Sequence, residues 1–205
     1  MYTLMLVDDD PAIREIFSIF LKKTGFQVHV VPGGKECLDF LKTTVPDLIL
    51  LDIMMEPMDG WETLNAIRNS PATRSIPVIM LSGKEPAPDE LRQYGKWIED
   101  YIMKPVDFKT LAGSLTEIIE YHRNMHMEVK RLKIEGFDPA VIDEYCNLRQ
   151  TIVVSKKLVH RFRDTWRVND DGIRMQEERL RQLRVTLGLP VSEQPGDSQV
   201  GKNAF

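Results

Sequence analysis

The 205-residue chain has few of the features that mark disulfide-rich or membrane proteins. Its only cysteines are Cys37 and Cys146, which lie far apart and exclude a disulfide framework. No apolar run approaches the roughly 20 residues that span a bilayer, which argues against a membrane segment. Residues 8–10 are aspartates that interrupt the first apolar run, so a signal-peptide pattern is missing as well. We therefore expect a cytoplasmic protein with no membrane segment.

Charge is unevenly divided along the chain, although its net charge is only −4. Residues 1–120 carry a net charge of −7, whereas residues 121–190 carry +4. The length also exceeds that of one average domain. We therefore expect an acidic first unit and a mildly basic second unit with different roles.

The first unit alternates short apolar runs with amphipathic segments. Runs of large aliphatic residues without polar alternation are typical of strands that are buried on both faces of a parallel sheet. Because helical segments separate these runs, the pattern predicts an α/β fold with a five-stranded parallel sheet covered by helices on both faces. The five strands are expected at residues 3–7, 28–31, 48–51, 76–81 and 100–103.

Polar residues follow four of these strands directly. Asp8 and Asp9 follow the first strand, Asp52 the third, Ser82 the fourth and Lys104 the fifth. The carboxyl ends of parallel strands meet at one edge of the sheet, where α/β folds place their ligands. Carboxylates at one edge repel each other unless a cation lies among them, and oxygen ligands suit Mg²⁺. A lysine and a hydroxyl can bind phosphate oxygens, so the set suits phosphoryl transfer with Asp52 as the nucleophile.

Taken together, the motifs at these strand ends resemble the response-regulator receiver domains of the CheY-like type. The resemblance covers residues 1–121 and implies a flavodoxin-like fold. Its motifs are Val7-Asp8-Asp9, Leu51-Asp52-Ile53-Met54-Met55, Met58-Asp59-Gly60, Ser82-Gly83 and Asp100-Tyr101-Ile102 running into Lys104-Pro105. The haloacid dehalogenase-like phosphatases also form an aspartyl phosphate, but they match less well because Met54 stands where they need a second aspartate.

The resemblance implies a role for each motif residue. Asp52 is the expected phosphoacceptor, Lys104 and Ser82 are expected to bind the phosphoryl group, and Ser82 and Tyr101 are the expected switch pair, moving inward together on phosphorylation. The expected Mg²⁺ ligands are Asp8, Asp9, Asp52 and the backbone carbonyl of Met54. A histidine kinase or a phosphotransfer protein would supply the phosphoryl group. The chain would be a signalling switch rather than an enzyme, catalysing only its own phosphorylation and dephosphorylation.

The chain departs from the receiver pattern before the fifth strand. Pro86 and Pro88 delay the preceding helix, and residues 95–98 read Gly-Lys-Trp-Ile where receivers have Gly-Ala-Asp. The proline of Glu56-Pro57 also stands one position later than usual. Receivers commonly present the fourth-helix region to their partners. These departures therefore concern partner choice more than phosphoryl chemistry.

Apolar residues continue past the first unit with alternating spacings of three and four, which is the heptad pattern of packed helices. We expect residues 122–190 to form a helical extension, either a coiled coil or a helical hairpin, that forms a homodimer or binds a partner protein. Residues 191–205 are expected to be a disordered tail. The first seam is Phe108, Leu111, Leu115, Ile118, His122, Met125, Val129 and Leu132, and the second is Val141, Tyr145, Leu148, Ile152, Ser155, Val159, Phe162 and Trp166.

A DNA-binding output is the alternative for the second unit. A basic run with a single acid, Asp164, could contact phosphates. The helix that carries the run, however, is too long and too regular for a compact helix-turn-helix. We therefore favour the dimerisation or protein-interaction module. The basic residues are Arg149, Lys156, Lys157, Arg161, Arg163 and Arg167.

Overall fold

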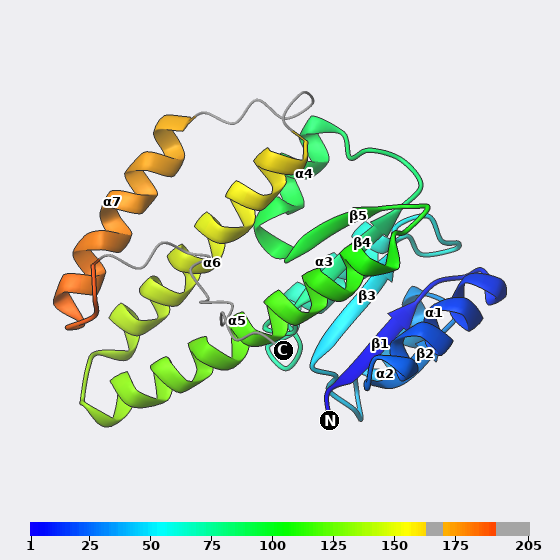
Figure 1. Ribbon diagram of the computed structural model, residues 1–205, viewed down its shortest axis with the longest axis horizontal. Helices are drawn as coiled ribbons and strands as arrows, with labels where there is room; N and C mark the ends of the chain where they lie inside the picture. The colour runs from blue at the N-terminus through cyan, green and yellow to red at the C-terminus, as the bar shows by residue number, and fades with distance from the viewer. Residues whose placement is uncertain (163–169, 192–205) are drawn as a thin grey trace, which may run out of the picture. The chain divides into compact units, whose positions relative to one another are not determined.

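The computed structural model describes residues 1–162 and 170–191, and these residues fall into two compact units. Residues 1–123 form the first, which we call the α/β unit, and residues 124–162 and 170–191 belong to the second, the helical unit (Figure 1). The helix α5 (Phe108–Ile134) runs through the boundary between them. The predicted organisation, an α/β fold followed by a helical extension, is confirmed.

The sheet of the α/β unit is five-stranded and entirely parallel, in the order β2-β1-β3-β4-β5. Its strands are β1 (Thr3–Val7), β2 (Gln27–Val31), β3 (Leu48–Asp52), β4 (Val78–Ser82) and β5 (Asp100–Met103). The fourth strand begins two residues later than predicted. Pro77 precedes it, accepting a hydrogen bond from the Ile49 N–H (2.9 Å) but having no N–H of its own to donate.

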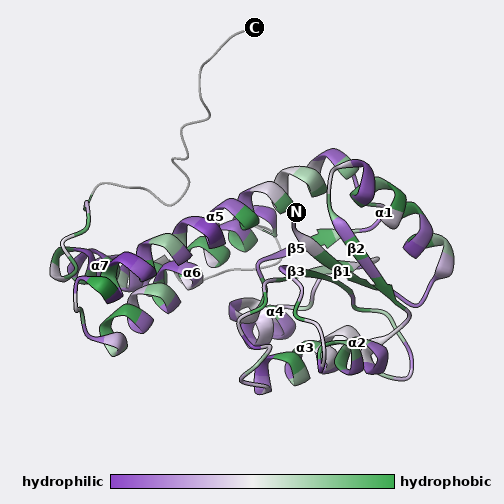
Figure 2. Cartoon of the chain, turned by 90° about the horizontal axis from the view of Figure 1, so that it is seen from below, coloured by the Kyte–Doolittle hydropathy of each residue, from purple (hydrophilic) through white to green (hydrophobic). Residues whose placement is uncertain are grey.

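Helices cover both faces of this sheet (Figure 2). On one face lie α1 (Pro11–Lys23) and the first half of α5, and on the other lie α2 (Gly34–Phe40), α3 (Gly60–Asn69) and α4 (Pro88–Tyr94). A short 3₁₀ turn, η1 (Gly95–Trp97), follows α4. Because both faces are covered, every residue of β3 and β4 is buried, as the continuous apolar runs predict.

Local capping sets where α1 begins, directly after the first strand. The Asp10 carboxylate accepts hydrogen bonds from the N–H groups of Ala12 (2.8 Å) and Ile13 (3.4 Å), and Pro11 is the first helical residue. The helix then packs Phe17 and Leu21 against the sheet. This cap leaves Asp8 and Asp9 in the short turn between strand and helix, at the carboxyl edge of the sheet.

The helical unit consists of the second half of α5 together with α6 (Pro139–Arg161) and α7 (Asp170–Thr186). Gly136, at φ +85°, ends α5, and Asp138 caps α6 by accepting a hydrogen bond from the Ala140 N–H (2.8 Å). The three helices share one apolar core. It contains Leu132, Ile142, Tyr145, Ile152, Leu180, Leu183, Leu187 and Leu189, with Met125, Val129, Val141 and Leu148 packed against it.

Heptad residues from both predicted seams therefore meet inside one chain, but the first seam is divided. Leu111, Leu115 and Ile118 pack in the core of the α/β unit, and Leu132 packs in that of the helical unit. Leu132 of the first seam and Tyr145 of the second are fully buried in the same core. The arrangement is a helical hairpin closed by a third helix, one of the two forms expected from the sequence. Trp166, the last residue of the second seam, and residues 192–205 of the expected tail lie outside the described residues.

Candidate functional site

Strand register brings the predicted site residues side by side at the carboxyl edge of the sheet. In the ladders, Val7 pairs with Leu51, and Asp52 pairs with Leu81. Asp8 and Ser82 follow Val7 and Leu81 directly, so they lie on either side of Asp52. Ser82 in turn pairs with Met103, which places Lys104 next in the row. A sheet of this order therefore gathers residues that are up to 96 positions apart in the chain.

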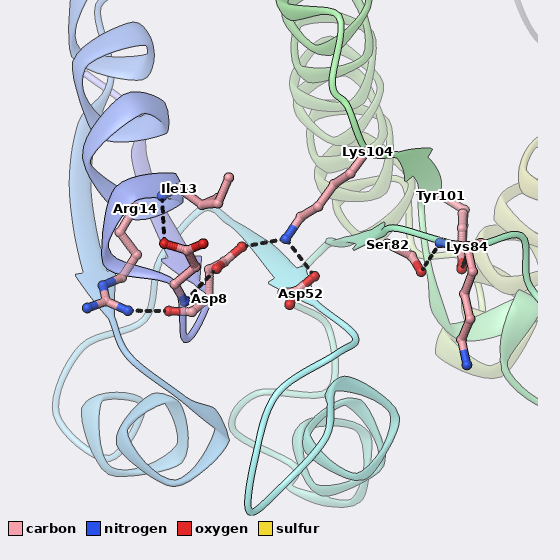
Figure 3. Close-up of polar contacts among 9 residues, drawn as sticks. Asp8, Ile13, Arg14, Asp52, Ser82, Lys84, Tyr101 and Lys104 are labelled. Carbon is pink, nitrogen blue, oxygen red and sulfur yellow. Dashed lines mark hydrogen bonds and ion pairs between the residues drawn. The ribbon is translucent and has the colours of Figure 1, made fainter.

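Lys104 connects the two buried carboxylates of the site (Figure 3). Its Nζ lies 2.7 Å from Asp8 Oδ2 and 2.9 Å from Asp52 Oδ1. Burial raises the pKa of Asp52, and the nearby Lys104 ammonium only partly opposes that rise. Burial by itself would lower the pKa of Lys104, but hydrogen bonds and attraction from Asp52 and Asp8 outweigh it and raise the pKa. The lysine is therefore held charged between two acids.

Three carboxylates at this edge are close enough to share one metal ion. Ligand oxygens of Asp8, Asp9 and Asp52 all lie within 4.8 Å of one another. Asp8 and Asp52 are buried, whereas Asp9 is exposed, so water can reach the cluster from one side. This donor set fits Mg²⁺, which takes few protein carboxylates and keeps several waters. Met54 lies in the loop after β3, and the role of its carbonyl stays a prediction.

Backbone packing fixes the loop that follows Asp52. A Cβ on Gly60 would lie 2.3 Å from the carbonyl oxygen of Asp52, so only glycine allows α3 to begin this close to the strand. Asp59 caps that helix through a capping box with Glu62. The Glu56–Pro57 peptide bond, where the sequence departs from the receiver pattern, is cis. The Met58-Asp59-Gly60 register is nevertheless intact.

The predicted switch residues lie on the strands beyond Asp52. Ser82 is buried, and its Oγ accepts a hydrogen bond from the Lys84 N–H (3.2 Å). The Tyr101 side chain is only 1% exposed, and its hydroxyl donates to the Lys84 carbonyl (2.8 Å). Burial raises the pKa of Tyr101 to about 12. Lys84 thus contacts both switch residues, through its N–H at Ser82 and through its carbonyl at Tyr101.

Comparison with known protein families identifies the family of the α/β unit. Residues 4–116 match the family described as the response regulator receiver domain, which is more than half of the chain. The chain belongs to this family. The recognition drawn from the strand-end motifs is therefore confirmed, and the α/β unit is a receiver.

Curated relatives of this receiver include two proteins that are named as DNA-binding regulators. The "DNA-binding dual master transcriptional regulator RpaA" of Synechocystis sp. is 27% identical over 142 residues, which are 69% of this chain and 59% of that protein. The "DNA-binding response regulator MtrA" of Mycolicibacterium smegmatis is 33% identical over 110 residues, which are 54% of this chain and 47% of that protein. The chain therefore spans about half the length of these relatives.

Solved receiver structures share the fold. The N-terminal domain of a response regulator receiver protein from Methanoculleus marisnigri is 50% identical, with a TM-score of 0.50 over 59% of this chain and 95% of that one. A CheY-like response regulator receiver domain protein from Methanospirillum hungatei is 32% identical, with a TM-score of 0.54 over 60% of this chain and 97% of that one. The predicted flavodoxin-like fold is confirmed.

Sequence reasoning missed two residues beside the receiver's site. Trp61 follows Gly60 in α3, and its indole N–H donates to a carboxylate oxygen of Glu90 in α4 (3.0 Å). A tryptophan in a helical apolar pattern reads as core, so the contact has no signature in sequence.

Within the described ranges, none of the helices is both long enough and apolar enough to cross a membrane.

Proposed function

We propose that this chain is a cytoplasmic two-component response regulator that accepts a phosphoryl group on Asp52. The observation that carries the proposal is the cluster in which Asp52 lies beside Asp8, Asp9 and the Lys104 ammonium. A histidine kinase, a phosphotransfer protein or a small phosphodonor supplies the group. The receiver spans residues 1–121, the helical extension residues 122–190 and the tail residues 191–205. The chain acts as a switch that catalyses only its own phosphorylation and dephosphorylation.

In the transfer step, an Asp52 carboxylate oxygen attacks the phosphorus of a phosphohistidine. A P–O bond forms, the P–N bond breaks, and the departing imidazole keeps the electron pair of that bond. Lys104, which contacts an Asp52 oxygen, then balances the charge of a phosphoryl oxygen. Asp8, Asp9, Asp52 and the Met54 carbonyl would hold Mg²⁺, which supplies further neutralisation of phosphoryl charge when bound.

The switch step follows from the hydrogen bonds around Ser82. Its hydroxyl accepts a bond from the Lys84 N–H and is able to donate to a phosphoryl oxygen on the neighbouring strand. Movement of Ser82 toward that oxygen would exchange its bond with the Lys84 N–H for a bond to the phosphoryl group. Because the Lys84 carbonyl is also the partner of Tyr101, the two switch residues would respond together.

Phosphate incorporation tests the proposed chemistry. Wild type should gain one phosphoryl adduct by intact mass when incubated with acetyl phosphate and Mg²⁺, and Asp52→Asn should gain none. Asp39→Asn is the matched control, because Asp39 is an exposed aspartate paired only with Lys42 at the surface. Equal labelling of wild type and Asp52→Asn would refute the assignment of Asp52.

For the output, we propose homodimerisation through the long helices. Most of the described heptad residues pack within the chain, whereas Met127 (64% exposed) and Ile134 (77% exposed) are exposed apolar residues of α5. They lie one heptad apart and therefore share one stripe of the helix. A second copy that packed on this stripe would bury both residues.

Light scattering tests this output. Wild type with Mg²⁺ and beryllofluoride, which mimics the phosphoryl group, should increase in mass, and Met127→Glu with Ile134→Glu should abolish the increase. Val185→Glu is the control, because Val185 is a comparably exposed apolar residue on α7 (65%). If the mass of wild type never changes, the output is a partner-binding face rather than assembly.

DNA binding, which is named for two relatives, has weaker support from the helical unit. Arg149 pairs with Glu128, Lys156 with Glu177 and Arg179 with Glu144, so these three cations of α6 and α7 are already paired with carboxylates. Arg163 and Arg167 of the basic run lie outside the described residues. Binding to random duplex DNA that weakens steeply with added salt would favour this alternative.

A further inference from the structure

A single carboxylate ties the receiver's α3 to the start of α4. Glu90 accepts the indole N–H of Trp61 on one oxygen (3.0 Å) and the backbone N–H of Ala87 on the other (2.7 Å). Ala87 precedes α4 and has no side chain able to cap it, so Glu90 supplies the capping bond. Trp61 is 6% exposed, which shields its N–H from competing water. The bond therefore connects a helix that begins directly after the Asp52 loop to the β4–α4 loop.

Aromatic packing extends this connection to the switch tyrosine. The Trp61 ring stacks on Tyr94 of α4, with centroids 4.7 Å apart and an interplanar angle of 11°. The Tyr101 ring lies 6.3 Å away from the same indole, in a tilted arrangement. Trp61 thus packs against both α4 and Tyr101. Any outward motion of Tyr101 or α4 would have to break contacts with this one side chain.

The α4 helix depends on such contacts because it is very short. It has seven residues, and two prolines, Pro86 and Pro88, stand at its entrance. A helix of this length is not stable in water without tertiary packing. The Trp61 and Glu90 contacts provide that packing at the point where the β4–α4 loop carries the Lys84 carbonyl, the partner of Tyr101.

We propose that Trp61 and Glu90 are positioning residues of the switch, which hold α4 and the Tyr101 ring in the inward arrangement that the receiver needs to bind a phosphoryl group. This inference rests on the proposed phosphorylation of Asp52. It names the residues that determine how readily that phosphorylation switches the receiver. When only a fraction of the free protein has the binding-competent arrangement, apparent affinity falls in proportion to that fraction. The clamp formed by Trp61, Glu90 and Tyr94 keeps that fraction high.

Beryllofluoride affinity in the presence of Mg²⁺ measures the effect directly. Trp61→Phe removes the N–H donor but keeps an aromatic ring, and Glu90→Gln keeps the shape of Glu90 but has one acceptor oxygen instead of two. Each variant should weaken beryllofluoride binding about 5-fold, the usual effect of one lost hydrogen bond. The losses in the double variant should be less than additive, because Trp61→Phe already removes one of the two donors that Glu90 accepts in wild type. Asp89→Asn is the control, since Asp89 carries the same charge on the same turn of α4 and its side chain is 93% exposed.

A second readout separates positioning from general loss of structure. In Trp61→Phe without any phosphoryl mimic, the ring resonances of Tyr101 should shift toward those of an exposed tyrosine, while the thermal midpoint stays near that of wild type. Unchanged affinity in both variants, or tighter binding in Glu90→Gln, would overturn the clamp. If wild type fails to bind beryllofluoride and matches Asp52→Asn, the proposed phosphorylation fails instead, and the Tyr101 resonances still test whether the clamp holds that ring.

Discussion

The two units of this chain differ in how far their carboxylates are balanced by cations. At the edge of the receiver sheet, Asp8, Asp9 and Asp52 gather around one ammonium, that of Lys104, and the excess is negative. In the helical unit, Glu128 accepts from the Tyr145 hydroxyl and pairs with Arg149, so one cation balances this carboxylate beside the core. Burying carboxylates without enough cations to balance them costs free energy. Their presence in the receiver indicates a site for a cation and a phosphoryl group, and their balance in the helices indicates a packed scaffold.

The largest effect should come from removing the ammonium that contacts both Asp8 and Asp52. Lys104→Ala should slow phosphorylation of Asp52 by about 100-fold or more, the usual cost of losing one group that stabilises transition-state charge. Rates of adduct formation by intact mass measure this. Lys84→Ala is the control, because Lys84 is an exposed lysine of the neighbouring loop whose backbone, not its side chain, contacts the switch residues. Equal rates in wild type and Lys104→Ala would show that the carboxylates do not need this charge.

A core substitution in the helical unit should affect stability without affecting phosphoryl chemistry. Leu132 is fully buried among the three helices, so Leu132→Ala should lower the free energy of unfolding of that unit by about 2–5 kcal/mol. Ile134→Ala, two residues later at an exposed position, should change it by about 0.5 kcal/mol or less. Urea unfolding followed by circular dichroism measures both. A large fall in the rate of Asp52 phosphorylation in Leu132→Ala would contradict the separation of roles.

The smallest effect should appear at the two thiols, one in each unit. Burial raises the pKa of the Cys37 thiol to about 12 and, as the largest cause, that of Cys146 to about 11. The reactive thiolate is the minor form below the pKa, so both should react slowly with alkylating reagents at pH 8, and both rates should increase as pH rises. Mass spectrometry over a pH series measures the rates, and unfolded protein in urea provides the fast reference. Labelling of the folded chain at the unfolded rate would show that these thiols are not shielded.

Several parts of the site could be predicted from the sequence, because a parallel sheet brings the residues that follow its strands side by side. Unbroken aliphatic runs predict β1 and β3, and the residues directly after a run, such as Asp8, must then lie at the carboxyl edge. The same logic places Ser82 and Lys104 in the row with Asp52, as the register confirms. Their chemical roles stay predictions.

Other features depend on tertiary contacts that cannot be predicted from the local sequence pattern. Heptad spacing is the same whether two helices pack within one chain or between two chains, so Leu132 could not report that its partners are in α6 and α7. His122 occupies a heptad position, yet its Nε2 lies 3.1 Å from Glu99 at the start of β5. The bond between Trp61 and Glu90 joins residues 29 positions apart that show no spacing signal.

Magnesium binding measured by calorimetry tests the contrast between the units most directly. Wild type should bind one Mg²⁺ per chain, Asp9→Asn and Asp52→Asn should each bind it about 10-fold more weakly or not at all, and Glu128→Gln should bind it as wild type does. Asp9 is exposed at the sheet edge, so its substitution leaves the core intact. Absence of binding to wild type, or equal binding by Asp9→Asn, would contradict the claim that the excess carboxylates form the receiver's ion site.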